Sequence, residues 1–246
     1  MAPFLQWNKT RNPSDIIKDF PIRFGNFYEP FLGSGEIFFN LFSNGRIFNK
    51  AYLASSNRNL ITTYKAVKDE PERLQNMILK YCENNSRQFF ENMKFCEASP
   101  SAYIYLNRAK DETGKWRASQ FINRNKEISK DVSDIQVCSN YLNRWCAGIH
   151  NQDWEATLTP FNGLQSGDLV WLEPPKLVYT KDARIDYVSN GFNESNHVYL
   201  NNFCKQIASK GVYVYMIQDN VPATEKIYGK PKWFVGKTNQ ESLYVY

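Results

Sequence analysis

The 246-residue sequence predicts an α/β fold built on an open sheet. Short β-like runs alternate with helical patterns near both ends of the chain, which is typical of such sheets. A glycine-rich turn, Gly33-Ser34-Gly35, joins the first of these runs to a helical pattern. The composition, 42% hydrophobic and 15% aromatic, is sufficient to bury a full core. The length fits one large domain or a domain with a sizeable insertion.

Four β-like runs and a terminal one are apolar and bounded by turn residues. The run GDLVWLE has continuous apolar residues, which indicates a buried central strand. The expected strands are 24–32, 45–55, 167–173, 211–220 and the terminal 241–246.

Helical patterns lie between the expected strands. The pattern that precedes the 211–220 run begins after Asn or Ser and stops at Gly, as helices commonly do. Asn is frequent throughout the chain, which favours caps and turns over helix interiors. The expected helical segments are 34–42, 59–85 and 193–211.

The middle of the chain differs from its two ends. It is long, mostly helical or loop-like, and separates the second strand from GDLVWLE. We interpret it as an insertion at the edge of the sheet. The predicted organisation is therefore a first α/β part at 1–65, the insertion at 66–150 and a second α/β part at 151–246.

A basic and aromatic stretch lies inside the insertion. Residues 103–130 hold seven Lys or Arg against three acidic residues, although the net charge of the whole chain is only +5. Basic residues interleaved with aromatic residues suit contact with phosphates and bases. A solvated loop or helix face is the alternative interpretation.

Composition also limits other function classes. The sequence contains no run of 18 apolar residues, so it predicts no membrane-spanning helix. The N-terminus lacks the apolar region of a signal peptide. We therefore expect an intracellular, soluble protein. The five cysteines include no C-x-x-C pair, so reduced thiols are expected and no metal site is predicted at Cys138, Cys146 and His150. His150 and His197 are expected to be structural.

Two motifs carry the functional prediction. Glycines at Gly33 and Gly35 permit a tight turn and close approach of a ligand at a helix start, although the turn lacks the Lys-Ser/Thr ending of a Walker A loop. The second motif is Glu173-Pro-Pro-Lys176, directly after the GDLVWL run. Consecutive prolines fix the backbone and remove two donors, which suits a rigid lip over a pocket.

The order of these motifs resembles the Dam-like family of DNA adenine-N6 methyltransferases, the D12 class. The resemblance begins with Glu29-Pro-Phe-Leu-Gly-Ser-Gly35, passes through a second strand and a long insertion, and reaches the x-Pro-Pro-x motif. It also covers LQWNKTRN, where the family has Lys-Trp-x-Gly-Gly-Lys, and YLNR, IQDN and ESLYVY further along. The resemblance implies a class I methyltransferase-like (Rossmann-like) open sheet with an inserted, mostly helical target-recognition subdomain.

The resemblance also assigns candidate site residues. Those implied to bind S-adenosylmethionine are Trp7, Phe31, Gly33, Gly35, Ser55 and Asp153. The lip that would hold an extruded adenine is Glu173, Pro174, Pro175 and Lys176, where the family has Asp-Pro-Pro-Tyr. The nucleic-acid-binding candidates are Arg108, Lys115, Trp116, Arg117 and Arg124.

This sequence departs from the family at positions that matter for methyl transfer. Glu173 keeps a carboxylate one methylene further out than Asp, and a misplacement of about 1 Å can cost ~10²-fold in rate. Lys176 cannot stack on a base and adds a positive charge near a sulfonium; Tyr179 is a candidate replacement ring. Ser55 replaces an acid that would accept hydrogen bonds from ribose. Lys9 and Thr10 replace the paired glycines of the opening motif.

We therefore expect a DNA adenine methyltransferase-family protein that is catalytically impaired or inactive and binds DNA, a protein partner, or both. An active subunit of the same family is one candidate partner. S-adenosylmethionine is the cofactor that the family implies, and its binding is expected to be weakened or lost. Two alternatives stay open: an active, site-specific adenine-N6 methyltransferase, and a structural subunit of a larger assembly. The family and the Asn-, Tyr- and Phe-rich composition suggest a viral or mobile-element origin.

Overall fold

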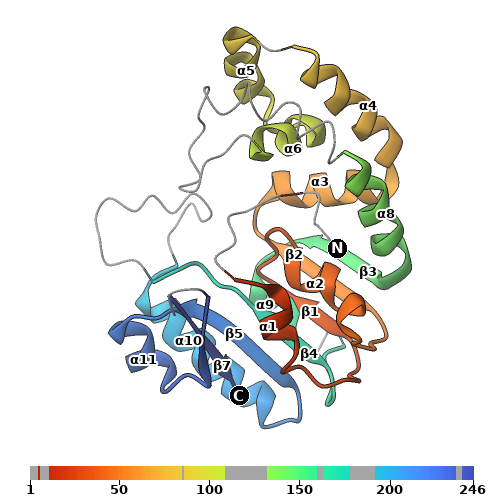
Figure 1. Cartoon of the computed structure of the whole chain (residues 1–246). Helices are drawn as coiled ribbons and strands as arrows, with labels where there is room; N and C mark the ends of the chain where they lie inside the picture. Colours follow the sequence, from red (N-terminus) through yellow and green to blue (C-terminus); the bar gives the residue numbers. More distant parts are fainter. Residues whose placement is uncertain are drawn as a thin grey trace. The chain divides into compact units, whose positions relative to one another are not determined.

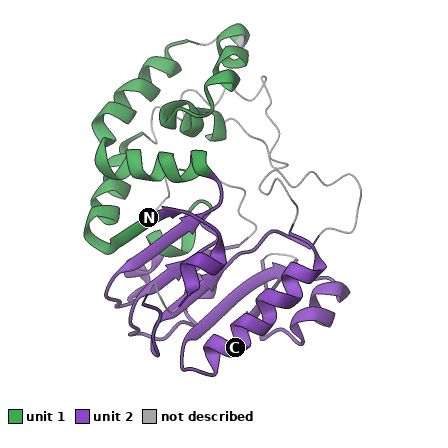
Figure 2. Ribbon diagram, turned by 180° about the vertical axis from the view of Figure 1, so that it is seen from behind, with its two compact units in different colours: residues 1–9, 33–39, 58–149 green, residues 10–32, 40–57, 150–246 purple. Residues whose placement is uncertain are grey.

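The computed structural model describes residues 5, 11–84, 86–108, 132–159, 163–177, 192–236 and 240–246. The chain divides into two compact units, shown in different colours in Figure 2. Unit 1 comprises residues 1–9, 33–39 and 58–149, and unit 2 comprises 10–32, 40–57 and 150–246.

A mostly parallel seven-stranded sheet organises the described part of the chain, and six of its strands lie wholly in unit 2. The strand order is β3-β2-β1-β4-β5-β7-β6 (Figure 1). Strands β2, β1, β4 and β5 are mutually parallel, whereas β7 is antiparallel to both β5 and β6. The fold is thus a class I methyltransferase-like α/β sheet, as the sequence predicted. The bounds are β1 Phe27–Glu29, β2 Ala51–Ser55, β3 Cys146–Asn151, β4 Leu169–Leu172, β5 Tyr213–Asp219, β6 Trp233–Val235 and β7 Glu241–Val245.

The five expected strands are all present, although shorter than predicted, and two strands were missed. β3 mixes buried and exposed residues without alternation, so its periodicity gave no strand signal. β6 has only three residues and follows Pro231, which reads as a turn in the sequence. Both are outer strands of the sheet, where pairing depends on a neighbour rather than on the local pattern.

Alternate side chains of β4 and β5 pack on opposite faces of the sheet in unit 2. On one face, Leu172 and Val214 join a core with Leu200 and Cys204 of helix α10. On the other face, the Phe20 ring lies between Trp171 and Tyr215, with ring centroids 6.0 Å and 4.5 Å away. The helices of this unit are α1 Pro13–Ile17, α9 Trp154–Leu158, α10 Glu194–Ala208 and α11 Pro222–Tyr228, with the 3-10 turn η1 Phe42–Asn44.

A buried carboxylate fixes the start of the two central strands. Asp168, immediately before β4, accepts main-chain hydrogen bonds from Asn26 (2.7 Å) and Gln165 (2.8 Å). A side chain at Gly25 would collide with this carboxylate, so glycine is required there. The contact holds the start of β1 beside the start of β4.

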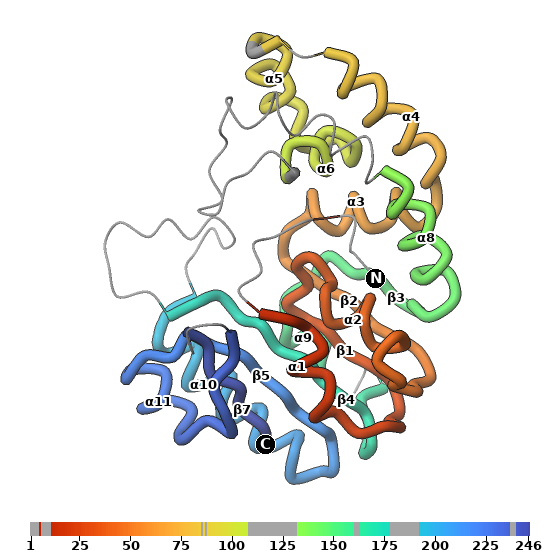
Figure 3. Tube along the Cα trace, in the orientation of Figure 1, coloured from red at the N-terminus to blue at the C-terminus, as the bar shows by residue number. Residues whose placement is uncertain are grey.

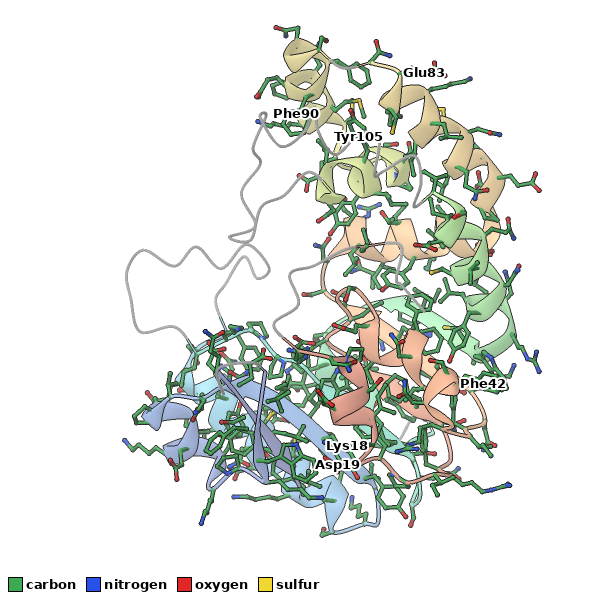
Figure 4. All side chains as sticks on the ribbon, in the orientation of Figure 1. Lys18, Asp19, Phe42, Glu83, Phe90 and Tyr105 are labelled. Atoms are coloured by element: carbon green, nitrogen blue, oxygen red, sulfur yellow. The ribbon has the colours of Figure 1, made fainter. Side chains whose placement is uncertain are left out.

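Unit 1 is helical around residues 58–145. The expected helical segment 59–85 is two helices, because Pro71 cannot continue α3 and instead starts α4. Figure 4 labels Phe90 and Tyr105, two fully buried rings of α5 and α6. The Tyr105 ring packs edge-on against Tyr81, with centroids 5.6 Å apart. The helices are α3 Arg58–Asp69, α4 Pro71–Cys82, α5 Arg87–Met93, η2 Lys94–Cys96, α6 Pro100–Arg108 and α8 Ser133–Trp145; α2 Glu36–Asn40 begins in this unit and ends in unit 2.

Within the described residues, no helix has both the length and the apolar character needed to cross a membrane. The same residues hold no group of His, Cys, Asp and Glu side chains placed to bind a metal ion. All five cysteines are free thiols.

Candidate functional site

The Glu173-Pro-Pro-Lys176 segment, which we call the lip, directly follows the fully buried strand β4. Pro174 is buried, Pro175 is half-buried, and both flanking side chains reach solvent. The carboxyl ends of parallel strands meet at one edge of a sheet, where ligands of α/β proteins bind. The lip therefore lies at the edge of the sheet where α/β proteins bind their ligands.

Arg11 binds the first residue of the lip. One terminal nitrogen of its guanidinium lies 2.7 Å from a Glu173 carboxylate oxygen, and the other lies 2.8 Å and 2.9 Å from the two Glu241 oxygens. The side chains of Arg11 and Glu241 are only 8% and 7% exposed, whereas Glu173 is 45% exposed. Burial opposes the charge of Arg11, but the two carboxylates outweigh it and hold the pKa of Arg11 above its ordinary value.

Lys176 at the other end of the lip is also paired. Its ammonium lies 2.5 Å from a carboxylate oxygen of Asp219, the last residue of β5, and 3.9 Å from one of Glu241. Arg11, Glu173, Lys176, Asp219 and Glu241 form one connected set, which we call the ion-pair network. Two cations and three carboxylates leave it with a formal charge of −1.

The network draws on distant parts of the sequence. Arg11 comes just before α1, and Glu241 opens β7; the red segment that begins at residue 11 and the blue C-terminal segment in Figure 3 both belong to unit 2. Sequence reasoning did not identify Arg11, Asp219 or Glu241 as site residues. Their signal was present, because LQWNKTRN, IQDN and ESLYVY all lie in segments that resemble the family.

Ser55 at the end of β2 uses its side chain locally. Its hydroxyl oxygen accepts a hydrogen bond from the main-chain N–H of Asn57 at 3.2 Å. Its carbonyl accepts from the Asn151 side chain (2.9 Å) and from the Gln152 main chain (3.2 Å). The end of β2 is therefore tied to the segment that carries Asp153.

Asp153 caps helix α9, and its carboxylate accepts a hydrogen bond from the main-chain N–H of Ala156 at 2.8 Å. The neighbouring Trp154 ring stacks on Phe31, with centroids 6.3 Å apart. Three predicted cofactor residues of unit 2, Phe31, Ser55 and Asp153, are thus linked through residues 151–154.

Gly33 and Gly35 belong to unit 1, where Tyr64 of α3 fixes their turn. The Tyr64 hydroxyl donates to the Gly33 carbonyl at 2.9 Å. Gly35 has φ +67°, and a Cβ on it would lie 2.6 Å from the Tyr64 hydroxyl oxygen. Gly35 is therefore required by the turn itself, in addition to any role toward a ligand.

Ser55 at the end of β2 stands where the family resemblance implies an acid that would bind the ribose of S-adenosylmethionine. The expected charged acceptor is replaced by Ser55, whose hydroxyl oxygen already accepts a main-chain hydrogen bond. A hydroxyl cannot supply the bidentate acceptor that a carboxylate offers to two ribose hydroxyls. Ser55 therefore offers a ribose one hydroxyl group and no charged acceptor with two oxygens.

Several predicted positions lie outside the described residues. Arg108 ends helix α6, but its side chain is not among the described ones. The other positions without a described placement are Trp7, Lys9, Thr10, Lys115, Trp116, Arg117, Arg124 and Tyr179.

The His197 side chain is fully buried in unit 2, as expected for a structural histidine. Its Nδ1 lies 2.5 Å from the Tyr228 hydroxyl, and the Phe192 ring packs edge-on against it. Burial lowers the pKa of His197 to about 4, so the ring is neutral at physiological pH.

The strand order, the glycine turn after β1 and the lip after β4 define a methyltransferase-like protein. A family model described as D12 class N6 adenine-specific DNA methyltransferase matches residues 8–146. The chain belongs to this family, as the sequence motifs indicated. The matched range includes the glycine turn and ends before the lip.

Two relatives match over nearly the whole chain. The Type II methyltransferase M1.LlaDCHI of Lactococcus lactis subsp. cremoris is 27% identical over 250 residues, which cover 93% of this chain and 84% of the relative. The Type II methyltransferase M.MjaIII of Methanocaldococcus jannaschii is 22% identical over 263 residues, which cover 93% and 88%. Both alignments span nine-tenths of the chain, so the similarity extends well beyond the matched family range.

Proposed function

We propose that this chain is a D12-family protein whose methyl-transfer step is impaired and that it acts by binding DNA, a protein partner, or both. The observation that carries the proposal is that both non-proline residues of the lip are bound to side chains of the chain itself. Glu173 pairs with Arg11, and Lys176 pairs with Asp219. S-adenosylmethionine binding is proposed to be weakened, because Ser55 stands where the family has an acid.

The family's reaction explains why these pairings matter. Adenine N6 is a poor nucleophile, since its lone pair is delocalised into the ring, and the base must be extruded and gripped before it reacts. An acceptor at the Glu173 position polarises the amino group, and a ring at the Lys176 position stacks on the base for about 1–3 kcal/mol. A carboxylate held by a buried guanidinium is a weaker acceptor than a free one, and an ammonium provides no stacking surface.

Calorimetry and a methyl-transfer assay test this proposal on the full chain. We expect no transfer of labelled methyl groups to adenine-containing DNA by the wild-type protein, and weak or undetectable heat with S-adenosylmethionine. The double variant Glu173→Asp with Lys176→Tyr restores the family's lip and is the matched comparison. Turnover by the wild-type protein that Glu173→Ala abolishes would overturn the proposal.

An active adenine-N6 methyltransferase is the second candidate function. It is favoured by the carboxylate that Glu173 retains and by the Type II methyltransferases that align with 93% of the chain. It predicts micromolar binding of S-adenosylmethionine, which the same calorimetry measures.

DNA binding is tested separately from chemistry. If the basic stretch binds phosphates, affinity for duplex DNA falls steeply with rising salt. Charge reversal at Arg108, Lys115 and Arg117 is expected to weaken binding and flatten the salt dependence. Unchanged binding in these variants would argue against this placement, and absence of salt-sensitive binding would favour a structural subunit.

A further inference from the structure

Gln218, the penultimate residue of β5, contacts the main chain of the lip. Its side-chain nitrogen donates to the Pro174 carbonyl at 3.0 Å and lies 3.3 Å from the Pro175 carbonyl. The residue is only 3% exposed. We propose that Gln218 is a positioning residue that sets the geometry of the lip by holding both proline carbonyls.

The prolines create the need for such a residue. Proline has no N–H, so Pro174 and Pro175 cannot anchor themselves to a neighbouring strand as donors. Their carbonyls remain strong acceptors, and a buried acceptor without a donor is costly. One amide nitrogen carries two hydrogens and is therefore able to serve both carbonyls.

The end of β5 holds the lip in two ways. Gln218 holds its main chain, while the next residue, Asp219, pairs with the Lys176 ammonium. Adjacent residues of a strand point to opposite faces. The lip is therefore held by two adjacent side chains at the end of the same strand, which explains how two consecutive residues without N–H groups stay in place.

The orientation of the Gln218 amide follows from its surroundings. Its oxygen is buried and has no hydrogen-bond partner among the described residues. A flipped amide would place that oxygen against the two carbonyls and lose both bonds. In this contact Gln218 acts only as a donor and the two proline carbonyls only as acceptors. Neither an ionised carboxylate nor an apolar side chain can replace it.

The consequence for the site rests on the proposed function. In the family, the carbonyl of the first lip proline is an acceptor for the adenine amino group. In this chain, Gln218 supplies an sp² –NH₂ group to that carbonyl from within the sheet. The Pro174 carbonyl is therefore already hydrogen-bonded, and an incoming amino group has to share it.

Hydrogen exchange of the full-length protein tests, without any activity measurement, whether Gln218 holds the lip in place. We expect Gln218→Met to speed exchange about tenfold in the peptide covering residues 171–177, because the lip loses both bonds. The matched control is Asn201→Leu, which removes another buried amide that donates to a main-chain carbonyl, that of Ile227, at 2.7 Å. The control is expected to leave this peptide unchanged; equal acceleration in both variants, or none in Gln218→Met, would overturn the inference.

A second variant covers the case in which Gln218→Met does not fold. Gln218→Glu keeps the shape, and its carboxyl donates to Pro174 only when protonated, a state that burial favours. Protection of the lip from exchange should approach the wild-type value at about pH 5 and fall at about pH 8. The wild-type protein is measured at each pH as well, to correct for any effect of pH on the ion-pair network. Protection that stays low at both pH values would contradict a donor role. Methyl transfer is measured separately. If the wild-type protein transfers methyl groups and Gln218→Met loosens the lip, the proposed function is wrong but the positioning role of Gln218 stands.

Discussion

Replacing Arg11 by Met tests whether the ion-pair network stabilises unit 2. The variant leaves Glu241, whose side chain is 7% exposed, as a buried carboxylate without its guanidinium. Removing one partner of a buried pair costs about 3–5 kcal/mol, because the remaining charge is desolvated and uncompensated. Lys176 is 3.9 Å from Glu241 and offsets part of this loss. We therefore expect Arg11→Met to lower the free energy of unfolding by about 3 kcal/mol.

The opposite end of the same ion pair is expected to matter much less. Glu173 is 45% exposed, so Glu173→Gln removes a partly solvated interaction and should cost about 1 kcal/mol or less. Arg73→Met is the surface control, because the Arg73–Glu70 pair has side chains 78% and 51% exposed and should contribute only a few tenths of a kcal/mol.

Equilibrium urea unfolding measures all three variants. Tryptophan fluorescence reports on unit 2 through Trp154, Trp171 and Trp233 and on unit 1 through Trp145, and far-UV circular dichroism checks that the transitions coincide. Adding Glu241→Leu to Arg11→Met should recover most of the loss, since a buried ion pair is often replaced by apolar residues without penalty. Equal costs for Arg11→Met and Arg73→Met would refute the reasoning.

Three further outcomes are expected. Gly35→Ala should cost about 2 kcal/mol in urea unfolding, because it strains φ +67° and displaces Tyr64; Gly45→Ala, with φ +71° and open space, should cost about 1 kcal/mol. His197 has a folded-state pKa of about 4 against 6.5, so acidification from pH 6.5 to 4 protonates the unfolded state first and removes up to about 3 kcal/mol. His197→Phe should flatten that pH profile; an unchanged slope would contradict the assignment. Asp168→Asn should cost about 2–3 kcal/mol, since one amide oxygen cannot replace two carboxylate acceptors; a melting temperature within 2 °C of wild type, roughly 1 kcal/mol or less, would count against this.

The sheet could be predicted because local patterns and tertiary structure agree there. The run 167–173 is apolar and ends at Pro174, and β4 is buried and ends at Leu172. Pro71 also indicates the break of segment 59–85, since proline cannot continue a helix. The apolar periodicity runs through the break and by itself predicts one helix. β3 and β6 were missed because the neighbouring strand, and not the local pattern, defines them.

The site was predictable only in its motifs. From the sequence, Glu173 and Lys176 were interpreted as departures from the family motif, but the sequence did not indicate that residues 11, 219 and 241 are their ion-pair network partners. No spacing rule connects residues that are more than 40 positions apart in the chain. The sheet order places the ends of β4 and β5 and the start of β7 together. The contacts among these residues can be predicted only once that order is known.

The ion-pair network gives the Lys176 ammonium a different interpretation from the one that the sequence alone suggested. From the sequence, the ammonium was an added positive charge where a ring is expected. In the structure, Lys176 compensates Asp219 and part of Glu241, and the whole network carries a formal charge of −1. A tyrosine in its place would leave a formal charge of −2 at the same edge. Lys176 at the fourth lip position is therefore coupled to the acid at the end of β5, and a Lys176→Tyr substitution loses that charge compensation as well as changing the shape of the side chain.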